Sequence, residues 1–501
     1  MTERGGGHAS RRSERTILGW PMKMLATNLL QLLLTILLQP GGTLAQQDPA
    51  APAPSAPPRA LNEHDGVYFG IWPDTAHGFS DTPAMINQRL GFNTSVFQIA
   101  QLIPLPTYNY TTGAGGPAPE YLIEQTQTDA AVFLTVYPTG LDVVTDDDLK
   151  LLGVQLQGYT EVLNRTVFLR FGPEMQGQWN PYGFQPTKFL ALWRRMYSLV
   201  KAAAPRVAVV WAPNTPQSYP YGQLSSSLSP EDLALLDTDH DGKVSNTDDP
   251  FSPYYPGDDQ VDWIGLSTYY KGPNFQNINV AQPSGYCSSV MNGTSPTSSF
   301  NWYEMYCTKP GKACMIAESG AAFHVDALTA QASTARSIVD LQRAWWQDCI
   351  TSPSLLQAFP RLKLHMHFEH VKLEMDGGKP DLRDYRLSND TTTLEAFKQD
   401  FSAVSAQFVV ASFRALPAGV PPTGRPSGSP NSPVPVVPGQ PGQPGQPKGI
   451  VFQTQRNPVV TGPPTLFGNR RSNAPNSLVN SGLLVLASSS LLLHLLLFPS
   501  F

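Results

Sequence analysis

Eight apolar runs recur along the middle of the chain, separated by longer stretches with helical patterning. In chain order they cover residues 67–72, 94–100, 130–138, 166–171, 206–214, 261–270, 312–319 and 362–369. Between the fourth and fifth runs, residues 189–203 place apolar side chains at helical spacing. Strand-like runs that alternate with helical stretches predict repeated βα units, and eight such units predict a (β/α)8 TIM barrel. We expect no open doubly wound sheet, because no Gly-rich phosphate loop follows any run.

Two of the runs carry a glutamate at their carboxyl ends. Glu174 follows a Gly-Pro break in FLRFGPEMQGQW (168–179), and Glu318 precedes a Ser-Gly turn in KACMIAESG (312–320). The carboxyl ends of barrel strands are where this fold places its chemistry. Glycoside hydrolysis needs two carboxyl groups, one to protonate the leaving oxygen and one to attack or to activate water. A glutamate at a strand end can also cap a helix or pair with an arginine, so a purely structural interpretation stays open.

Composition narrows the class of substrate. The chain has 501 residues, a formal net charge of -5 and 15% charged residues. Without a basic surplus, we expect no nucleic-acid partner. A mildly acidic chain with aromatic residues in its loops suits a neutral substrate such as a polysaccharide, and we expect a monomer.

Four cysteines, at positions 287, 307, 314 and 349, match no zinc-binding spacing. In a secreted chain they predict two disulfides, and the sequence does not choose among the three possible pairings. Four buried free thiols are the alternative.

An acidic loop interrupts the chain between the fifth and sixth runs. DTDHDGKVSNTD (237–248) fits the template of a calcium-binding loop, with a glycine for the turn at its sixth position. The expected ligands are the side chains of Asp237, Asp239, Asp241 and Asp248 and the carbonyl of Lys243. We therefore predict a structural Ca²⁺ inside an insertion, with a metal-free acidic surface loop as the alternative.

Four segments resemble glycoside hydrolase family 26, the β-mannanase family of a retaining (β/α)8 clan. RFGPEMQGQW (170–179) resembles the family's RxxHEMNGxW stretch, and YYPGDDQVDWIGLSTYY (254–270) resembles its YPGDxxVDWxGxxxY segment. VVWAPN (209–214) is similar to its WxxPN strand, and AESG (317–320) looks like its nucleophile strand. The likeness covers roughly residues 65–400 and implies a retaining hydrolase of a β-linked, mannan-type polysaccharide without a catalytic cofactor.

The resemblance also assigns roles to individual residues. It implies that Glu174 is the general acid/base and Glu318 the nucleophile, that Tyr269 orients Glu318, that Arg170 holds both carboxylates, and that Trp179 stacks on a sugar.

The family's His and Asn in the acid/base stretch are Pro173 and Gln176 here, so other β-linked glycans and a catalytically inactive glycan-binding barrel stay open. Apart from the resemblance, Trp72, Trp211 and Trp302 are candidate sugar platforms, each with core packing as its alternative.

Both ends of the chain predict export to the cell surface. Residues 1–45 have the basic leader, apolar run and small-residue cleavage site of a signal peptide, and 46–60 form a Pro/Ala-rich linker before the barrel region, 61–415. Residues 416–475 are a Pro/Gly-rich stalk, and 476–501 end in the apolar tail of a GPI-attachment signal. We expect an extracellular protein held at the membrane by a lipid anchor, with an uncleaved leader or a retained transmembrane helix as alternatives.

Overall fold

The computed structural model describes residues 66–75, 81–107, 115–221, 228–273, 278–295, 299–326, 332, 336–376, 379–388 and 390–414. The predicted signal peptide (1–45), linker (46–60), stalk (416–475) and anchor signal (476–501) lie outside these residues. Within the described ranges, no helix is both long and apolar enough to cross a membrane.

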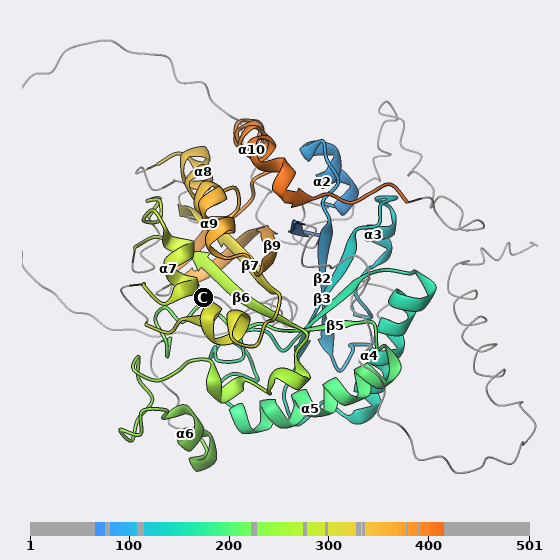
Figure 1. Cartoon of the computed structure of the whole chain (residues 1–501), viewed down its shortest axis with the longest axis vertical. Coiled ribbons are helices and arrows are strands. Elements are labelled where there is room, and N and C mark those ends of the chain that lie inside the picture. Colours follow the sequence, from blue (N-terminus) through green and yellow to red (C-terminus); the bar gives the residue numbers. More distant parts are fainter. Residues whose placement is uncertain are drawn as a thin grey trace, which may run out of the picture. The chain divides into compact units, whose positions relative to one another are not determined.

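A closed ring of eight parallel strands forms the centre of the molecule (Figure 1). The strands are β1 (Val67–Pro73), β2 (Val96–Ile103), β3 (Ala131–Pro138), β4 (Val167–Phe171), β5 (Ala208–Trp211), β6 (Trp263–Tyr270), β7 (Cys314–Ala321) and β9 (Leu362–Glu369). Each pairs in parallel with the next, and β9 pairs with both β7 and β1, which closes the ring. The predicted (β/α)8 barrel and all eight predicted strands are confirmed.

Helices follow most of the strands. They are α2 (Pro83–Leu90), α3 (Tyr121–Glu124), α4 (Asp146–Gln157), α5 (Pro186–Ala203), α6 (Pro230–Leu236), α7 (Tyr286–Asn292), α8 (Ile338–Cys349), α9 (Pro353–Ala358) and α10 (Thr391–Val404). The acidic start of α4 is a capping box, in which Thr145 and Asp148 each accept a hydrogen bond from the other's backbone N–H. Helix α5 buries Phe189, Trp193 and Val200, as its apolar spacing predicts.

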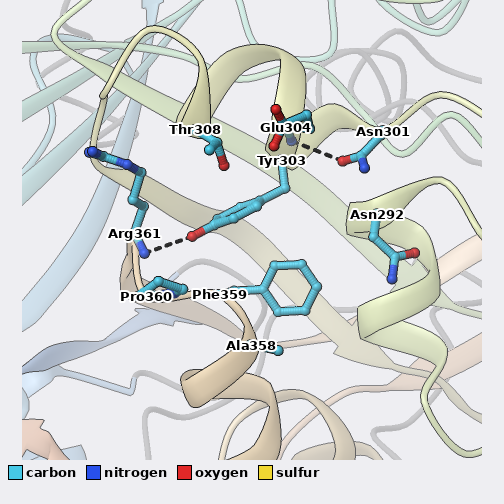
Figure 2. Close-up of a pocket in the computed structure, with 9 residues that line it drawn as sticks. All are labelled: Asn292, Asn301, Tyr303, Glu304, Thr308, Ala358, Phe359, Pro360 and Arg361. Carbon is cyan, nitrogen blue, oxygen red and sulfur yellow. Dashed lines mark hydrogen bonds between the residues drawn. The ribbon is translucent and has the colours of Figure 1, made fainter.

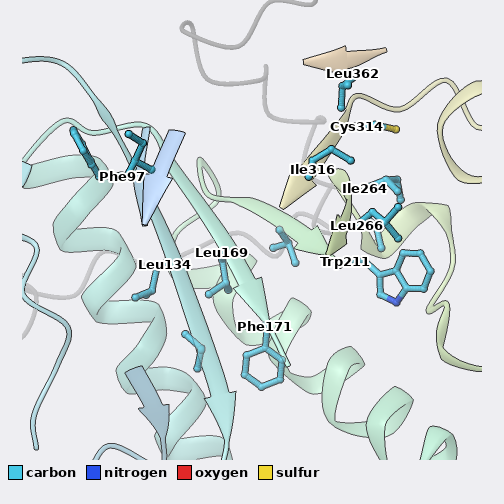
Figure 3. Close-up of a cluster of buried hydrophobic side chains, with 14 of the residues drawn as sticks. Phe97, Leu134, Leu169, Phe171, Trp211, Ile264, Leu266, Cys314, Ile316 and Leu362 are labelled. Atoms are coloured by element: carbon cyan, nitrogen blue, oxygen red, sulfur yellow. The ribbon is translucent and has the colours of Figure 1, made fainter. Parts of the chain in front are cut away.

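Side chains alternate between the two faces of each barrel strand. On β4, Phe168 packs with the cluster inside the barrel, whereas Leu169 and Phe171 pack with the larger cluster between strands and helices. Figure 3 shows Leu169 and Phe171 in this outer cluster, together with Trp211 of β5. The alternation points Arg170 into the barrel, because it lies between two outward residues.

A second, antiparallel sheet grows from the carboxyl ends of two barrel strands. It consists of β8 (Phe323–Asp326), β10 (Val371–Asp376) and β11 (Lys379–Asp384), with β11 in the middle. Strand β8 follows β7 after one residue, and β10 follows β9 after one residue. The sequence did not predict this sheet, because its strands are short and rich in charged residues.

Two disulfides tie the outer layer together. Cys287–Cys349 joins α7 to α8, and Cys307–Cys314 joins the π-helical turn Tyr303–Thr308 to the first residue of β7. The predicted number of disulfides is confirmed, and the structure supplies the pairing that the sequence left open.

Candidate active site

A sharp turn after β4 carries Glu174 beyond the end of the strand. Gly172 and Glu174 both have left-handed backbones, with φ of 52° and 54°. Glycine adopts this conformation freely, but glutamate does so rarely, and such residues cluster at functional sites. The backbone N–H of Glu174 donates to the carbonyl of Ala212 at 2.9 Å, which fixes the turn against the end of β5.

A β-bulge in β7 turns Glu318 into the barrel. Leu266 of β6 pairs with Ile316, but the next residue, Ser267, pairs with Glu318, so Ala317 is an extra residue in β7. Ile316 packs outward and Ala317 inward. Strict alternation would point Glu318 outward again, toward the helices. The bulge resets the alternation and aims the carboxylate inward, a use of bulges that recurs beside active sites.

Arg170 brings the two carboxylates together. One guanidinium nitrogen, Nη1, donates to Glu318 Oε2, and the other, Nη2, lies 3.9 Å from Glu174 Oε1. Tyr269 donates its hydroxyl to Glu318 Oε1 at 2.6 Å, and Trp179 donates Nε1–H to Glu174 Oε2 at 2.9 Å. The structure therefore places together five residues that the sequence singled out, and both carboxylates contact the same cation.

The two carboxylates differ in their surroundings. Burial raises the pKa of Glu174, and the negative charge of Glu318 raises it further, while Arg170 and the hydrogen bond from Trp179 oppose both effects. Glu318 accepts hydrogen bonds from Arg170 and Tyr269. Burial and the nearby Glu318 both raise the pKa of Tyr269, which keeps its hydroxyl protonated as a donor. The two carboxyl groups thus differ: burial and a neighbouring charge act on Glu174, and two hydrogen-bond donors hold Glu318.

An aromatic cluster on the inner face of the barrel reaches the pair through Tyr269, which donates to Glu318. Trp72, Phe368 and Tyr385 form one buried cluster, against which Tyr137 and Tyr269 pack. Trp72 lies 5.2 Å from Phe368, and Tyr269 lies 5.4 Å from Tyr385, between ring centroids. The sequence reasoning missed Tyr137 and Tyr385. The alternation could have found Tyr137, which has the same parity as the inward Phe133 on β3.

Trp211 and Trp302 lie outside this group. Both are fully buried. Trp211 has the parity of outward residues on β5, its ring packs 5.0 Å from that of Tyr255, and its Nε1 donates to the carbonyl of Tyr254. The structure thus supports the core interpretation for both residues. Trp179 is part-exposed beside Glu174, where a sugar ring can reach it.

The acidic loop forms a separate cluster after α6. Carboxylate oxygens of Asp237, Asp239 and Asp248 all lie within 4.8 Å of one another, so these three residues could hold a metal ion. Asp241 stands outside this group, and its carboxylate lies 3.3 Å from the ammonium of Lys243. Asp248 is fully buried and accepts the backbone N–H of Thr238 and Ser245, at 2.6 and 2.7 Å. The buried aspartate organises the loop through its own backbone.

A surface pocket of about 480 Å³ lies apart from the two glutamates, and Figure 2 shows the residues that line it. Its lining includes Tyr303, Phe359 and Arg361, and the hydroxyl of Tyr303 accepts the backbone N–H of Arg361. Arg361 immediately precedes β9, so the pocket is at the amino ends of the strands, opposite the two glutamates. We therefore assign the candidate active site to the mouth with the carboxylates.

Comparison with known proteins does not assign the chain to a family. No protein-family profile and no curated protein matches its sequence. Among solved structures, it is similar to a modular endo-β-1,4-mannanase of glycoside hydrolase family 26 from Cellulomonas fimi, with 15% identity, a TM-score of 0.40, and coverage of 70% of this chain and 75% of that one. The catalytic domain of a family 26 endo-β-1,4-mannanase from Bacillus sp. JAMB-750 matches with 13% identity, a TM-score of 0.41, and coverage of 69% and 87%. A fungal β-1,4-galactanase matches with 10% identity, a TM-score of 0.38, and coverage of 67% and 99%. At these identities and scores the likeness is one of general architecture and carries no statement about activity.

Proposed function

We propose that the chain is a retaining glycoside hydrolase that cleaves a β-linked polysaccharide, of mannan type, by double displacement. The observation that carries this proposal is the contact of Glu174 and Glu318 with the one guanidinium of Arg170, in unlike surroundings. In a retaining enzyme, one carboxyl group protonates the leaving oxygen while the other attacks the anomeric carbon.

We infer the two roles from the surroundings of each carboxyl group. Glu174, with its raised pKa, donates its proton to the departing glycosidic oxygen. Glu318, held by Arg170 and Tyr269, attacks the anomeric carbon and forms a glycosyl ester. Glu174, now ionised, takes a proton from water, and the water attacks the anomeric carbon and releases Glu318. Trp179 and Trp72 contribute the aromatic surface on which the sugar rings stack.

Sugar release from a panel of mannans, xylans and β-glucans tests the proposal, with the full chain beside Glu174→Gln and Glu318→Gln. NMR of the first product formed should show the β-anomer, because two inversions restore the original configuration. First formation of the α-anomer would instead indicate direct attack by water, with Glu318 as its base.

One observation favours a second candidate, a glycan-binding barrel without activity. Pro173 occupies the place of the family's histidine, and its carbonyl accepts a hydrogen bond from Tyr182 at 2.8 Å. That position therefore holds the turn together and offers no side-chain donor to the acid. Glycan binding without sugar release, unchanged in Glu174→Gln and Glu318→Gln, would establish this candidate in place of the hydrolase.

We also propose that the protein is secreted and held at the cell surface by a GPI anchor. The two disulfides support export, because such bonds persist in oxidising compartments. Treatment of intact cells with a phosphatidylinositol-specific phospholipase should release the protein into the medium. Release only by detergent would identify a retained transmembrane segment.

The acidic loop is proposed to bind Ca²⁺ as a structural ion. Its three clustered aspartates offer the oxygen ligands that a hard cation prefers, and the carboxylate of Asp241 and the carbonyl of Lys243 complete the proposed set. Chelation should lower the melting temperature and added Ca²⁺ should restore it. An unchanged melting temperature in both conditions would make the loop a metal-free surface turn.

A further inference from the structure

The surface pocket of Figure 2 has a glycosylation sequon at its edge. Asn292-Gly293-Thr294 has the Asn-X-Thr pattern that accepts N-linked glycans in secreted proteins. Asn292 is half-buried and lines the pocket, whereas Thr294 is exposed (Figure 2). The proposed mechanism does not use this pattern or the pocket. The sequence repeats the pattern at Asn93, Asn109, Asn164 and Asn389.

The end of α7 holds the sequon in a tight turn. Gly293 follows the helix with a left-handed backbone, φ 72°, and ends it. The amide oxygen of Asn292 accepts the hydroxyl of Thr294 at 2.6 Å and the backbone N–H of Thr294 at 3.0 Å. Both hydrogen bonds use Oδ1. Neither of them occupies Nδ2, the atom to which an N-linked sugar is attached.

The other sequons that the structure describes begin at Asn93 and Asn164. Asn93 donates from Nδ2 to the carbonyl of Ala411 at 3.2 Å, and the next residue, Thr94, is fully buried. Because a glycan is bulky and polar, its attachment there would break this bond and oppose the burial. Asn164 is exposed and is not among the residues that line the pocket. Of these three asparagines, Asn292 alone borders the cavity.

The pocket offers the groups that a sugar ring needs. Its most buried lining residues are Tyr303 and Phe359, whose rings meet edge to face with centroids 4.8 Å apart. Its volume of about 480 Å³ lies within the range of small-ligand sites, in which aromatic surface and a few polar groups fix the ligand. An amide, a carboxylate, a hydroxyl and a guanidinium complete the lining, from Asn301, Glu304, Thr308 and Arg361.

Covalent and hydrogen bonds hold this lining in place. The disulfide Cys307–Cys314 joins the π-helical turn that carries Tyr303 to β7, and the hydroxyl of Tyr303 accepts the backbone N–H of Arg361 at 2.8 Å. Short π-helical turns often occur at functional sites. A lining that is already fixed loses little conformational freedom when a sugar binds to it.

We propose that Asn292 carries an N-linked glycan whose first N-acetylglucosamine lies in this pocket against Phe359. This inference rests on the proposed export and is independent of the hydrolase function. In the transfer, Nδ2 of Asn292 attacks the anomeric carbon of an oligosaccharide that is joined to a lipid diphosphate. The new C–N bond forms as the bond from that carbon to the diphosphate oxygen breaks, the amide gives up one proton, and the lipid diphosphate leaves.

Mass spectrometry of the full chain, purified from a eukaryotic host, tests the modification. Amidase release of glycans in H₂¹⁸O converts each glycosylated asparagine into labelled aspartate, and position 292 should carry the label. Thr294→Ser keeps the sequon and should keep the label, whereas Thr294→Ala should lose it. An unlabelled Asn292 in a chain labelled at another sequon would overturn the inference and leave export intact. A chain without label at any sequon would refute both.

Thermal unfolding tests the contact with the pocket. Thr294→Ala, which lacks the glycan, should lower the melting temperature by about 2 °C. Asn164→Gln, at the exposed sequon outside the pocket, is the matched control and should leave it unchanged. In a Phe359→Leu background, which lacks the aromatic ring, Thr294→Ala should cause no further loss. Equal losses in the two backgrounds would overturn the proposed contact.

A measurement on the parent chain needs no variant to fold. Endoglycosidase trimming of its glycan to the first N-acetylglucosamine should leave the melting temperature unchanged, because that sugar makes the contact with the pocket. A fall as large as that in Thr294→Ala would place the stabilising contact on outer sugars and overturn the proposal. Sugar release by the same preparations reports separately on the hydrolase.

Discussion

The barrel mouth and the acidic insertion loop each bring several carboxylates together, but the two regions shift the pKa of a carboxyl group in opposite directions. At the mouth, Glu174 and Glu318 are largely desolvated and share the guanidinium of Arg170. In the loop, Asp239 lies in solvent, and hydrogen bonds from Thr247 and from the backbone N–H of Asp241 lower its pKa. Burial at the mouth raises the pKa of Glu174 instead. The pKa of the same chemical group is thus raised in one region and lowered in the other.

The difference lies in what surrounds the oxygens. Backbone N–H groups fix an aspartate in its ionised form, which suits a metal ligand that never changes its proton. A desolvated carboxyl next to another negative charge has a raised pKa, which suits a group that donates a proton. Variants that replace the carboxylates, or the groups that hydrogen-bond to them, test this difference between the mouth and the loop.

The largest expected effect comes from Glu318→Gln. An amide cannot form the glycosyl ester, so kcat should fall by about 10⁴-fold or more, as it does when other enzymes lose a covalent nucleophile. The melting temperature should stay close to that of the parent, because the amide oxygen can still accept from Arg170 or Tyr269. Rates of sugar release and thermal unfolding measure the two quantities.

Asp239→Asn is the matched control in the other region. It also replaces a carboxylate by an amide, but in an exposed loop far from the glutamates in sequence, and activity should be unchanged at saturating Ca²⁺. Equal activity losses in the two variants would mean that the mouth has no special role.

A third carboxylate shows that burial alone does not create a proton donor. Burial opposes the ionised form of Glu369, but His367 and the backbone N–H groups of Ser388 and Leu387 outweigh it and lower the pKa of Glu369 to about 2. Because a tenfold change in proton affinity corresponds to about 1.4 kcal/mol, Glu369→Gln should lower the free energy of unfolding by roughly 3 kcal/mol at pH 7. Denaturant unfolding measures this loss.

The stabilisation that ionised Glu369 contributes depends on pH in one direction only. The folded-state pKa of Glu369 is depressed from its ordinary value of 4.5, so the stabilisation is present above pH 4.5 and is lost as pH falls toward 2. The difference in the free energy of unfolding between the parent and Glu369→Gln should therefore become smaller as the pH is lowered from 4.5 toward 2. A constant gap would show that the loss comes from packing and not from ionisation.

The sequence predicted the barrel and much of its mouth, for identifiable reasons. Apolar runs and turn residues are local signals, and Glu174, Arg170 and Trp179 lie within one short stretch. The bulge that aims Glu318 inward depends on the register between β6 and β7, which no local pattern encodes. Trp211 was a candidate platform because its chemistry fits, but only strand parity shows that it faces the helices.

A smaller effect is expected from Tyr269→Phe. The variant loses the hydroxyl that donates to Glu318 at 2.6 Å, while the ring keeps its contacts with Phe368 and Tyr385. One hydrogen bond to a charged group contributes about 1.5–3 kcal/mol, so kcat should fall by roughly 10- to 100-fold. A loss confined to KM would place Tyr269 in substrate binding instead.

The smallest effects separate the two kinds of aspartate within the loop itself. Asp248 is buried and accepts several backbone N–H groups, so Asp248→Asn leaves at least one of them without its acceptor and should lower the free energy of unfolding by about 1–3 kcal/mol even in chelator. Asp239→Asn should leave the melting temperature in chelator unchanged and should instead reduce the rise that added Ca²⁺ produces. Thermal unfolding of both variants with and without Ca²⁺ gives the comparison. If Asp239→Asn responds to Ca²⁺ as the parent does, the exposed aspartate is no ligand, and the loop is organised by the buried aspartate alone.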